Sequence, residues 1–507
     1  MVADGHAMRR YTVRVHPSKE RLPMRQQLAY RFAQVAAARP PLDENAVVTV
    51  IDRVIDDAAV AIAAIDRHAV AAARAQALAH PRERGATIWG GGERKYECEW
   101  AAWANGVAVR ELDFHDTFLG ADMGHPGDSI PPLLAVAQQM RRGGDDLVRA
   151  ILTAYEIDCA LIRSISLQKH KIDHIAHLAP AVAAGLGTLL RLDPKVTFHA
   201  IGHALHVATT TRQSRKGEIS SWKAYAPAFA GKMAIEAVDR AMRGETSPSP
   251  IYEGEDGIIA WLLDGPDARY EIELPSDDEP RRAILDTYTK AHSAEYQAQA
   301  LIDLAFRMRK LIGDVGRVTG VTLHTSSHTH VVIGSGANDP QKYDPDASRE
   351  TLDHSAPYIF AVALEDGEWH HERSYAPQRA HEPSTMRLWQ AIQTVEDPVW
   401  SARYHTVEPR EKAFGARAVM ILDDGRTIED ELFVADAHPN GAKPFARADY
   451  LEKFATLTSD KLDPGESRRF LDVVQRLPAL DGDGVSAVSL RCLPGELDRT
   501  RTEPGIF

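Results

Sequence analysis

Over the first 280 residues, apolar side chains recur at steps of three and four, and this spacing constrains the fold more than any other feature of the chain. Such spacing is typical of helices that bury one face, whereas strands alternate apolar and polar residues. The clearest case runs from Asp43, which can cap a helix, to Ile65. Further helices are predicted at 145–162, 178–191, 195–211 and 228–243. We therefore expect this part to be all-helical, after an irregular arm at 1–27.

The pattern changes after Glu279-Pro280. A helix is expected at about 295–312, and the apolar run Val318–Thr325 predicts a strand. Asp424-Gly425 lies between two further strand-like runs, which is a strong signal for a β-hairpin. This stretch is therefore predicted to mix helices and strands.

A chain of 507 residues is too long for a single hydrophobic core, so we expect two domains. Helical spacing returns after residue 446, which indicates that the end of the chain rejoins the helical part. The sequence thus predicts a mainly α protein. A discontinuous all-helical domain would comprise residues 1–282 and 439–507, and a smaller α+β lid domain residues 283–438.

The chain has a formal net charge of −13, with 44% hydrophobic and 26% charged residues. These proportions are typical of globular proteins, and the negative balance argues against nucleic acid or an anionic membrane as a partner. No stretch approaches the roughly 18 apolar residues of a membrane helix, and the N-terminal residues lack the apolar segment of a signal peptide. We therefore expect a cytoplasmic protein.

The three cysteines, Cys98, Cys159 and Cys492, lie far apart in the sequence. Scattered cysteines in a large chain are typical of free thiols in a reducing compartment. Iron–sulfur clusters need closely spaced thiolates, so an aconitase-like iron–sulfur enzyme is disfavoured. We expect no cofactor.

A first cluster of polar residues contains Asp113, Thr117, His125 and Asp128, with a Gly-rich loop between its two halves. Loops on a rigid scaffold often present catalytic groups. Asp113 and Thr117 are four residues apart and would share one face of a helix end. The alternative interpretation is a solvated loop in which Asp128 or Ser129 caps the following helix.

A second cluster consists of Lys169-His170-Lys171, followed by His174 and His177. Histidines three residues apart could bind a metal, but no carboxylate or cysteine lies at a supporting spacing. We therefore predict no metal site. A histidine at the start of a helix could instead orient or protonate a substrate, because imidazole titrates near neutral pH.

A third cluster is cationic and contains Arg212, Arg215, Lys216 and Lys223, while Lys290 lies where the two domains join. A lysine at a helix start, such as Lys223, meets the unfavourable positive end of the helix dipole unless an anion is bound there. The alternative is that these lysines are ordinary surface residues. Together, the clusters suit proton abstraction beside a carboxylate and a polycarboxylate substrate.

Several short motifs in combination resemble one known family. They are Ile88-Trp89-Gly90-Gly91-Gly92, Ala104-Asn105-Gly106, Asp113-Phe114-x-Asp116-Thr117, His125-Pro126-Gly127-Asp128, Ser221-Trp222-Lys223-Ala224 and Ala294-Glu295-Tyr296-x-Ala298-Gln299. This combination resembles the MmgE/PrpD family, and the last two motifs resemble its 2-methylcitrate dehydratase branch. The resemblance covers most of the chain.

The resemblance implies a helical domain with an α+β lid, a homodimer, and an active site without an iron–sulfur cluster. The family's active-site positions fall on Asp113, Thr117, His125, His177, Lys223, Lys290 and Tyr358. Lys223 and Lys290 would bind substrate carboxylates, and we add Arg212 and Asp128 as further expected substrate contacts.

The implied reaction is the dehydration of 2-methylcitrate to 2-methyl-cis-aconitate in the methylcitrate cycle of propionate breakdown. A base would remove a proton from the methyl-bearing carbon, and an acid would protonate the departing hydroxyl. His125, His177 and Asp113 are candidates, and the sequence leaves the assignment open. The alternatives are decarboxylation of cis-aconitate, another lyase or epimerase reaction on a polycarboxylate, and a non-catalytic helical binding protein.

Overall fold

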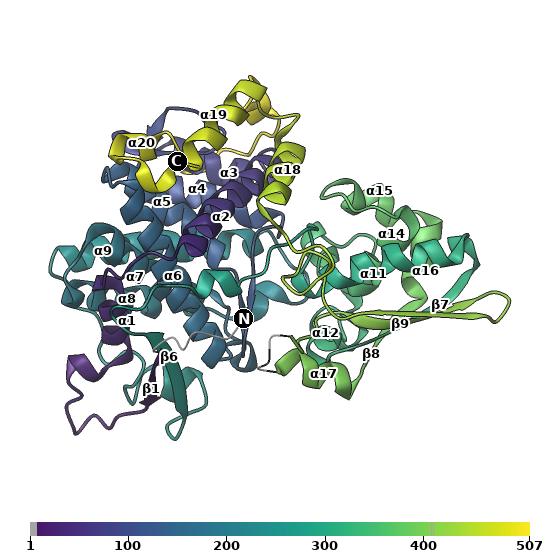
Figure 1. Cartoon of the computed structure of the whole chain (residues 1–507), viewed down its shortest axis with the longest axis horizontal. Helices are drawn as coiled ribbons and strands as arrows, with labels where there is room; N and C mark the ends of the chain where they lie inside the picture. Colours follow the sequence, from purple (N-terminus) through teal and green to yellow (C-terminus); the bar gives the residue numbers. More distant parts are fainter. Residues whose placement is uncertain (1–7, 407, 409) are drawn as a thin grey trace.

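The computed structural model describes residues 8–406, 408 and 410–507. It shows a large body made mostly of helices beside a smaller body that contains a sheet (Figure 1). The helices of the large body in the first half of the chain are α1 Leu28–Ala37, α2 Glu44–Ala63, α3 His68–Leu78, α4 Cys98–Glu111, α5 Ile130–Gln139, α6 Gly144–Ser164, α7 Ile175–Leu190, α8 Pro194–Ala208, α9 Trp222–Met242 and α10 Ile258–Leu262.

The predicted helices are confirmed, and their local causes are visible. The side chain of Asp43 accepts a hydrogen bond from the backbone N–H of Ala46, which starts α2. The predicted helices at 145–162, 178–191 and 195–211 correspond to α6, α7 and α8. The helix predicted at 228–243 starts earlier, at Trp222.

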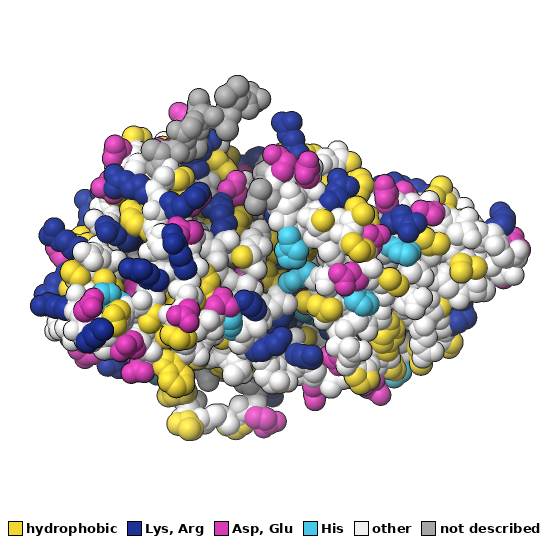
Figure 2. Space-filling model, turned by 90° about the horizontal axis from the view of Figure 1, so that it is seen from below, with side chains coloured by type: hydrophobic (Ala, Val, Ile, Leu, Met, Phe, Trp, Pro, Cys, Tyr) yellow, Lys and Arg dark blue, Asp and Glu magenta, His cyan; other side chains and the backbone are white. Residues whose placement is uncertain are grey.

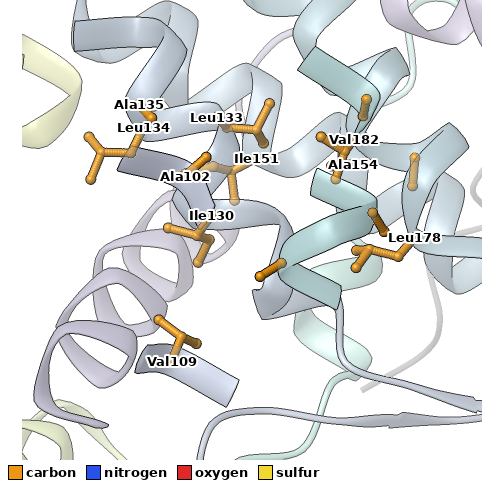
Figure 3. Close-up of a cluster of buried hydrophobic side chains, with 14 of the residues drawn as sticks. Ala102, Val109, Ile130, Leu133, Leu134, Ala135, Ile151, Ala154, Leu178 and Val182 are labelled. Atoms are coloured by element: carbon orange, nitrogen blue, oxygen red, sulfur yellow. The ribbon is translucent and has the colours of Figure 1, made fainter. Parts of the chain in front are cut away.

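The core of the large body lies between these helices (Figure 3). Val109 of α4, Ile130 and Leu133 of α5, Ile151 of α6 and Val182 of α7 are all fully buried. Burial of each such side chain stabilises the fold by about 1.5–3 kcal/mol. This packing forms a rigid base for the loops that connect the helices.

The expectation of an irregular N-terminal arm is wrong in part. Residues Met8–Arg14 form strand β1, which pairs antiparallel with β6, Arg269–Pro275. Two short hairpins also interrupt the helices: β2 Pro81–Thr87 with β3 Lys95–Tyr96, and β4 Phe118–Leu119 with β5 Met123–Gly124. Only Val13 of β1 is buried, so its sequence lacks the apolar alternation that reveals a strand.

The smaller body has a four-stranded mixed sheet of order β10-β9-β7-β8, in which only β7 and β8 are parallel. The predicted strand at Val318–Thr325 is β7, and the predicted hairpin is formed by β9 and β10. The elements of this body are α11 Tyr296–Ile312, β7 Val318–Thr325, α12 Ser327–Val332, α13 Arg349–Leu352, α14 Ala356–Asp366, α15 Pro377–Ala380, α16 Pro383–Gln390, β8 Ile392–Glu396, α17 Pro398–His405, β9 Ala416–Leu422 and β10 Thr427–Leu432.

The end of the chain returns to the large body through α18 Arg447–Thr458, α19 Pro464–Val474 and α20 Gly482–Ser486, which lie against its helices (Figure 1). One hydrophobic core takes buried residues from 13–284 and 454–492, and a second takes them from 294–422. We propose that the two domains follow this division, with boundaries near residues 282 and 439.

The three cysteines are buried and free. Within the described part of the chain, no helix combines the length and the apolar character that crossing a bilayer requires.

Glu253 gives the large body a pH-dependent stability. Its side chain is buried; Oε1 accepts a hydrogen bond of 2.6 Å from the backbone N–H of Leu28, and Oε2 has no hydrogen-bond partner among the described residues. Burial raises the pKa of Glu253 from 4.5 to about 7. A protonated Glu253 is therefore more favourable in the fold than an ionised one. This contribution to stability is complete below the pKa of Glu253 in the unfolded chain, and it is lost as the pH rises through about 7.

We expect Glu253→Gln to gain stability relative to the wild type at pH 8 but not at pH 4. The difference between the two pH values should be on the order of 3 kcal/mol, because one pKa unit corresponds to about 1.4 kcal/mol. Urea unfolding of both proteins at the two pH values measures it. An equal effect of the substitution at both would contradict the prediction.

Candidate active site

A small cavity of about 30 Å³ lies where the two bodies meet. The large body contributes the loop after α4, the start of α7 and residues before α9, and the smaller body contributes the start of α11 and the region of α12 to α14. Its wall consists of Arg110, Asp113, Asp122, Met123, His125, Gln168, Ile172, Asp173, His174, Arg212, Arg215, Lys290, Glu295, Val332 and His354. Histidine, lysine and arginine side chains gather along the middle of one face of the molecule, between its two bodies (Figure 2).

Asp113 is the centre of the charged groups at this cavity. It follows α4 and has a φ of 50°, in the left-handed region that costs a non-glycine residue about 1 kcal/mol or more. Its carboxylate accepts from Arg110 at 2.5 Å, from Lys223 at 3.0 Å and from Lys290. These three cations hold the pKa of Asp113 well below its usual value despite complete burial. Asp113 is therefore ionised and a poor proton acceptor.

Lys223 connects Asp113 to a second buried carboxylate, Asp353. Its Nζ lies 2.7 Å from both oxygens of Asp353, and the neighbouring His354 contacts the same carboxylate through Nδ1. Two carboxylates of the chain itself therefore pair with the lysine at the start of α9, where the sequence predicts a bound anion. Lys223 does not line the cavity, so its predicted direct contact with a substrate is not supported.

The buried network has an excess of positive charge. Arg110, Lys223, Lys290 and Arg349 carry four positive charges, against the two negative charges of Asp113 and Asp353. A cavity beside such an excess favours an anionic ligand.

A metal ion fits this network less well. Asp113, Asp353 and His354 offer ligand atoms within 4.8 Å of one another. However, the ammonium groups of Lys223 and Lys290 already donate to the two carboxylates. A cation bound there would be repelled by both lysines.

His125 lines the cavity with a defined tautomer. Its Nδ1 lies 2.8 Å from the backbone carbonyl oxygen of Asp116, so Nδ1 must carry the proton that is donated. Burial, together with Arg110 and Lys290, lowers the pKa of His125 well below 6.5. The ring is therefore neutral, and Nε2 has a free lone pair for a proton from a ligand.

The structure places His174, and not His177, at the cavity. His177 lies one turn into α7, and its Nε2 contacts the backbone carbonyl of Ile165 at 3.0 Å. His174 precedes the helix, lines the cavity, and has a ring centroid 5.5 Å from that of His125. His177 therefore contacts the backbone inside the helical body and does not line this cavity, and we propose His174 in its place as a site residue.

Three other predicted site residues do not line the cavity. Thr117 donates its hydroxyl to the carbonyl of Gly124 and so fixes the β4–β5 hairpin. Asp128 lies buried against His115, with 3.0 Å between Oδ1 and Nε2. Tyr358 lies in the core of the smaller body and donates its hydroxyl to the carbonyl of Ser374. Each has a structural partner that the sequence could not show.

Arg212 lines both the small cavity and an adjoining outer cavity of about 390 Å³. Among the described residues, no carboxylate forms an ion pair with Arg212. The outer cavity is bordered by further cations, Lys171, Arg215, Lys216 and Lys342, and by Asp339. This basic entrance would attract an anion towards the small cavity.

Helix α18 contacts the backbone of the segments that carry Asp113 and Lys290. Lys453 donates to the backbone carbonyls of Phe114 at 2.7 Å and Lys290 at 3.0 Å, and its Nζ lies 2.7 Å from Asp56. The C-terminal helices therefore help to place both Asp113 and Lys290.

Of the residues missed by sequence reasoning, Arg110, His174, Glu295 and His354 line the cavity. His174 belongs to the second sequence cluster, Glu295 belongs to the motif that starts at Ala294, and His354 lies four residues before Tyr358. Arg110 is three residues before Asp113, a spacing that brings ion pairs together near a helix end. Only the three-dimensional structure shows that these four residues line one cavity.

The chain matches two family models. The model of the MmgE/PrpD N-terminal domain matches residues 26–271, and that of the MmgE/PrpD C-terminal domain matches residues 292–479. Together they cover most of the chain.

Curated relatives give the same result at low identity. The chain is 24% identical to a probable 2-methylcitrate dehydratase of Saccharomyces cerevisiae over 68% of this chain and 67% of the relative. It is 26% identical to a 2-methylcitrate dehydratase of Cupriavidus necator over 73% and 77%. It is 24% identical to an alkylcitrate dehydratase of a fungal species over 73% and 75%. With both domain models matched in order, the chain belongs to the MmgE/PrpD family.

Proposed function

We propose that this protein is a hydro-lyase that removes water from 2-methylcitrate or a close 2-alkylcitrate. One observation carries the proposal: a neutral histidine with a free Nε2 lies in a cavity beside a buried network with excess positive charge. Elimination beside a carboxylate needs this combination, because a base must take the proton and cations must stabilise the charge that develops. The names of the relatives point to the same substrate class.

His125 is our candidate for the base. The hydrogen bond from Nδ1 to Asp116 leaves Nε2 as the accepting atom, and Asp113 cannot compete because three cations hold its carboxylate ionised at a low pKa. Arg110 and Lys290 line the same cavity and would stabilise the substrate carboxylate as the carbon beside it loses its proton.

Substrate entry requires the two bodies to separate locally. The small cavity of about 30 Å³ is far below the roughly 300–1,000 Å³ of typical small-molecule sites. We infer that this cavity widens when a substrate enters, and the outer basic cavity is our candidate for the point of entry.

A product assay tests the function. Purified protein is incubated with 2-methylcitrate, citrate and cis-aconitate, and the alkene products are followed by ultraviolet absorbance and mass spectrometry. We expect dehydration of 2-methylcitrate. Carbon dioxide release from cis-aconitate without this dehydration would indicate a decarboxylase, and binding without turnover would indicate a binding protein. Iron analysis of the active protein tests the expectation of no iron–sulfur cluster.

Arg212→Gln should raise KM with little change in kcat. We expect about a 10- to 100-fold increase, because a hydrogen bond to a charged group contributes about 1.5–3 kcal/mol and Arg212 would hold a substrate carboxylate before and during the reaction. Lys216→Gln, at the outer cavity, is the matched control and should change KM less than about 3-fold. Steady-state kinetics measures both, and an unchanged KM in Arg212→Gln would remove Arg212 from the binding site.

A further inference from the structure

Glu295 is a buried carboxyl group at the cavity that was absent from the predicted site. It precedes α11, and its Oε2 accepts a hydrogen bond of 2.7 Å from the backbone N–H of Gln297. The residue is only 2% exposed, and Oε1 has no hydrogen-bond partner among the described residues. Because Oε2 is used by the helix start, Oε1 is the buried carboxyl oxygen that is left without a partner among the described residues of this cavity-lining side chain.

Asp113 and Glu295 line the same cavity but differ in protonation, since Asp113 is ionised and Glu295 is not fully ionised at neutral pH. Three cations donate to Asp113 and keep it ionised. No cation forms an ion pair with Glu295 among the described residues, and burial raises its pKa to about 7. Glu295 therefore carries a proton in a large fraction of molecules at neutral pH. A carboxyl group that burial keeps protonated near neutral pH can act as a general acid.

The other groups of the cavity wall are less suited to donate a proton. The pKa of His174 is lowered to about 3 and that of His354 to about 4, both by burial, so neither is protonated at neutral pH. The Lys290 ammonium donates to Asp113, and an arginine does not release its proton.

Two further carboxyl groups line the cavity, Asp122 and Asp173. Asp122 accepts from the backbone N–H groups of Met123 and Gln168 through its two oxygens, and Asp173 is paired with Arg215. Both are held by partners within the chain. Glu295 is thus the carboxyl group of the wall that combines a proton with an unused oxygen.

We propose that Glu295 is the general acid that protonates the departing hydroxyl group, while His125 of the same cavity acts as the base. This proposal rests on the proposed hydro-lyase function. Nε2 of His125 takes the proton from the methyl-bearing carbon, and the electron pair of that C–H bond forms the double bond as the C–O bond breaks. The departing oxygen takes the proton of Glu295 and leaves as water. His125 ends protonated and Glu295 ionised, and one proton transfer between them through solvent restores the starting state.

Glu295→Gln tests the proposal, with Glu253→Gln as a matched control. Both glutamates are buried, accept one backbone N–H, and have a second oxygen without a partner among the described residues, but only Glu295 lines the cavity. Glutamine retains the size and the acceptor for Gln297 and removes the proton. We expect kcat for 2-methylcitrate to fall by about 100-fold or more in Glu295→Gln, with little change in KM, and to stay at the wild-type level in the control.

A substrate with a different leaving group separates acid catalysis from a structural role. In the analogue that carries fluorine in place of the hydroxyl group, the leaving fluoride needs little protonation. The loss caused by Glu295→Gln should therefore shrink to less than about 10-fold on this analogue. An equal loss on both substrates would show that Glu295 only positions the site and would overturn the proposal.

The activity of the wild-type protein distinguishes a failure of the hydro-lyase function from a failure of the general-acid role of Glu295. Absence of dehydration by the wild type would reject the hydro-lyase function, and the general acid with it. Dehydration by the wild type together with full activity of Glu295→Gln would reject the general acid alone.

Discussion

His125→Asn is expected to lower kcat for dehydration by about 100- to 10,000-fold, the range typical of a lost general base. An asparagine amide can still donate to the Asp116 carbonyl that now accepts from Nδ1, so the local structure should persist. It has no group that can accept a proton. Steady-state kinetics on the folded variant, checked by circular dichroism, measures the effect.

His177→Gln is the control for this prediction. Its amide can replace the contact that Nε2 makes with the carbonyl of Ile165, and the residue lies outside the cavity. We expect activity within about three-fold of the wild type. If His177→Gln were as inactive as His125→Asn, the sequence-based assignment would be restored and the structural one rejected.

Asp113→Asn is expected to have the largest effect on stability. Three cations, Arg110, Lys223 and Lys290, would lose a buried anionic partner, and such a loss typically costs about 3–5 kcal/mol. The depressed pKa of Asp113 sets the pH window. Its stabilising contribution is present above the pKa of the unfolded chain and is lost only as the pH falls through a folded pKa well below 3.8.

Urea unfolding at pH 7 measures this effect. Asp286→Asn is the control, because Asp286 pairs with Arg163 at the surface and its side chain is 62% exposed. Exposed pairs contribute at most about 1 kcal/mol, so the control should unfold almost like the wild type. Equal stability of Asp113→Asn and the wild type would show that the network is not held by this carboxylate.

The helices could be predicted from the sequence because each one carries its own signals. Apolar spacing and the cap at Asp43 lie within the segment that they organise. Strand β1 could not be predicted, since its partner β6 lies more than 250 residues away and almost none of its side chains are buried. Local patterns report burial against a neighbour, but they do not identify a distant partner.

The sequence singled out only part of the residues that meet at the cavity. Asp113, His125, Lys290 and Arg212 were predicted together and line it. The sequence predicts a bound anion beside Lys223, but it could not show that Asp353, 130 residues away, pairs with this ammonium. His174 and His177 are three residues apart, and only the exact start of α7 decides which of them faces the cavity.

The support that α18 gives to the site has a consequence for biosynthesis. A ribosome releases the chain from its N-terminus, so α2 and the loop at Asp113 emerge long before Lys453. Until then the buried residues contributed by 454–492 are missing from the first core, and the carbonyls of Phe114 and Lys290 lack their lysine. An unfinished chain therefore exposes apolar helix faces that favour aggregation and chaperone binding. Catalytic competence should appear only after Lys453 and residues 454–492 have emerged and packed.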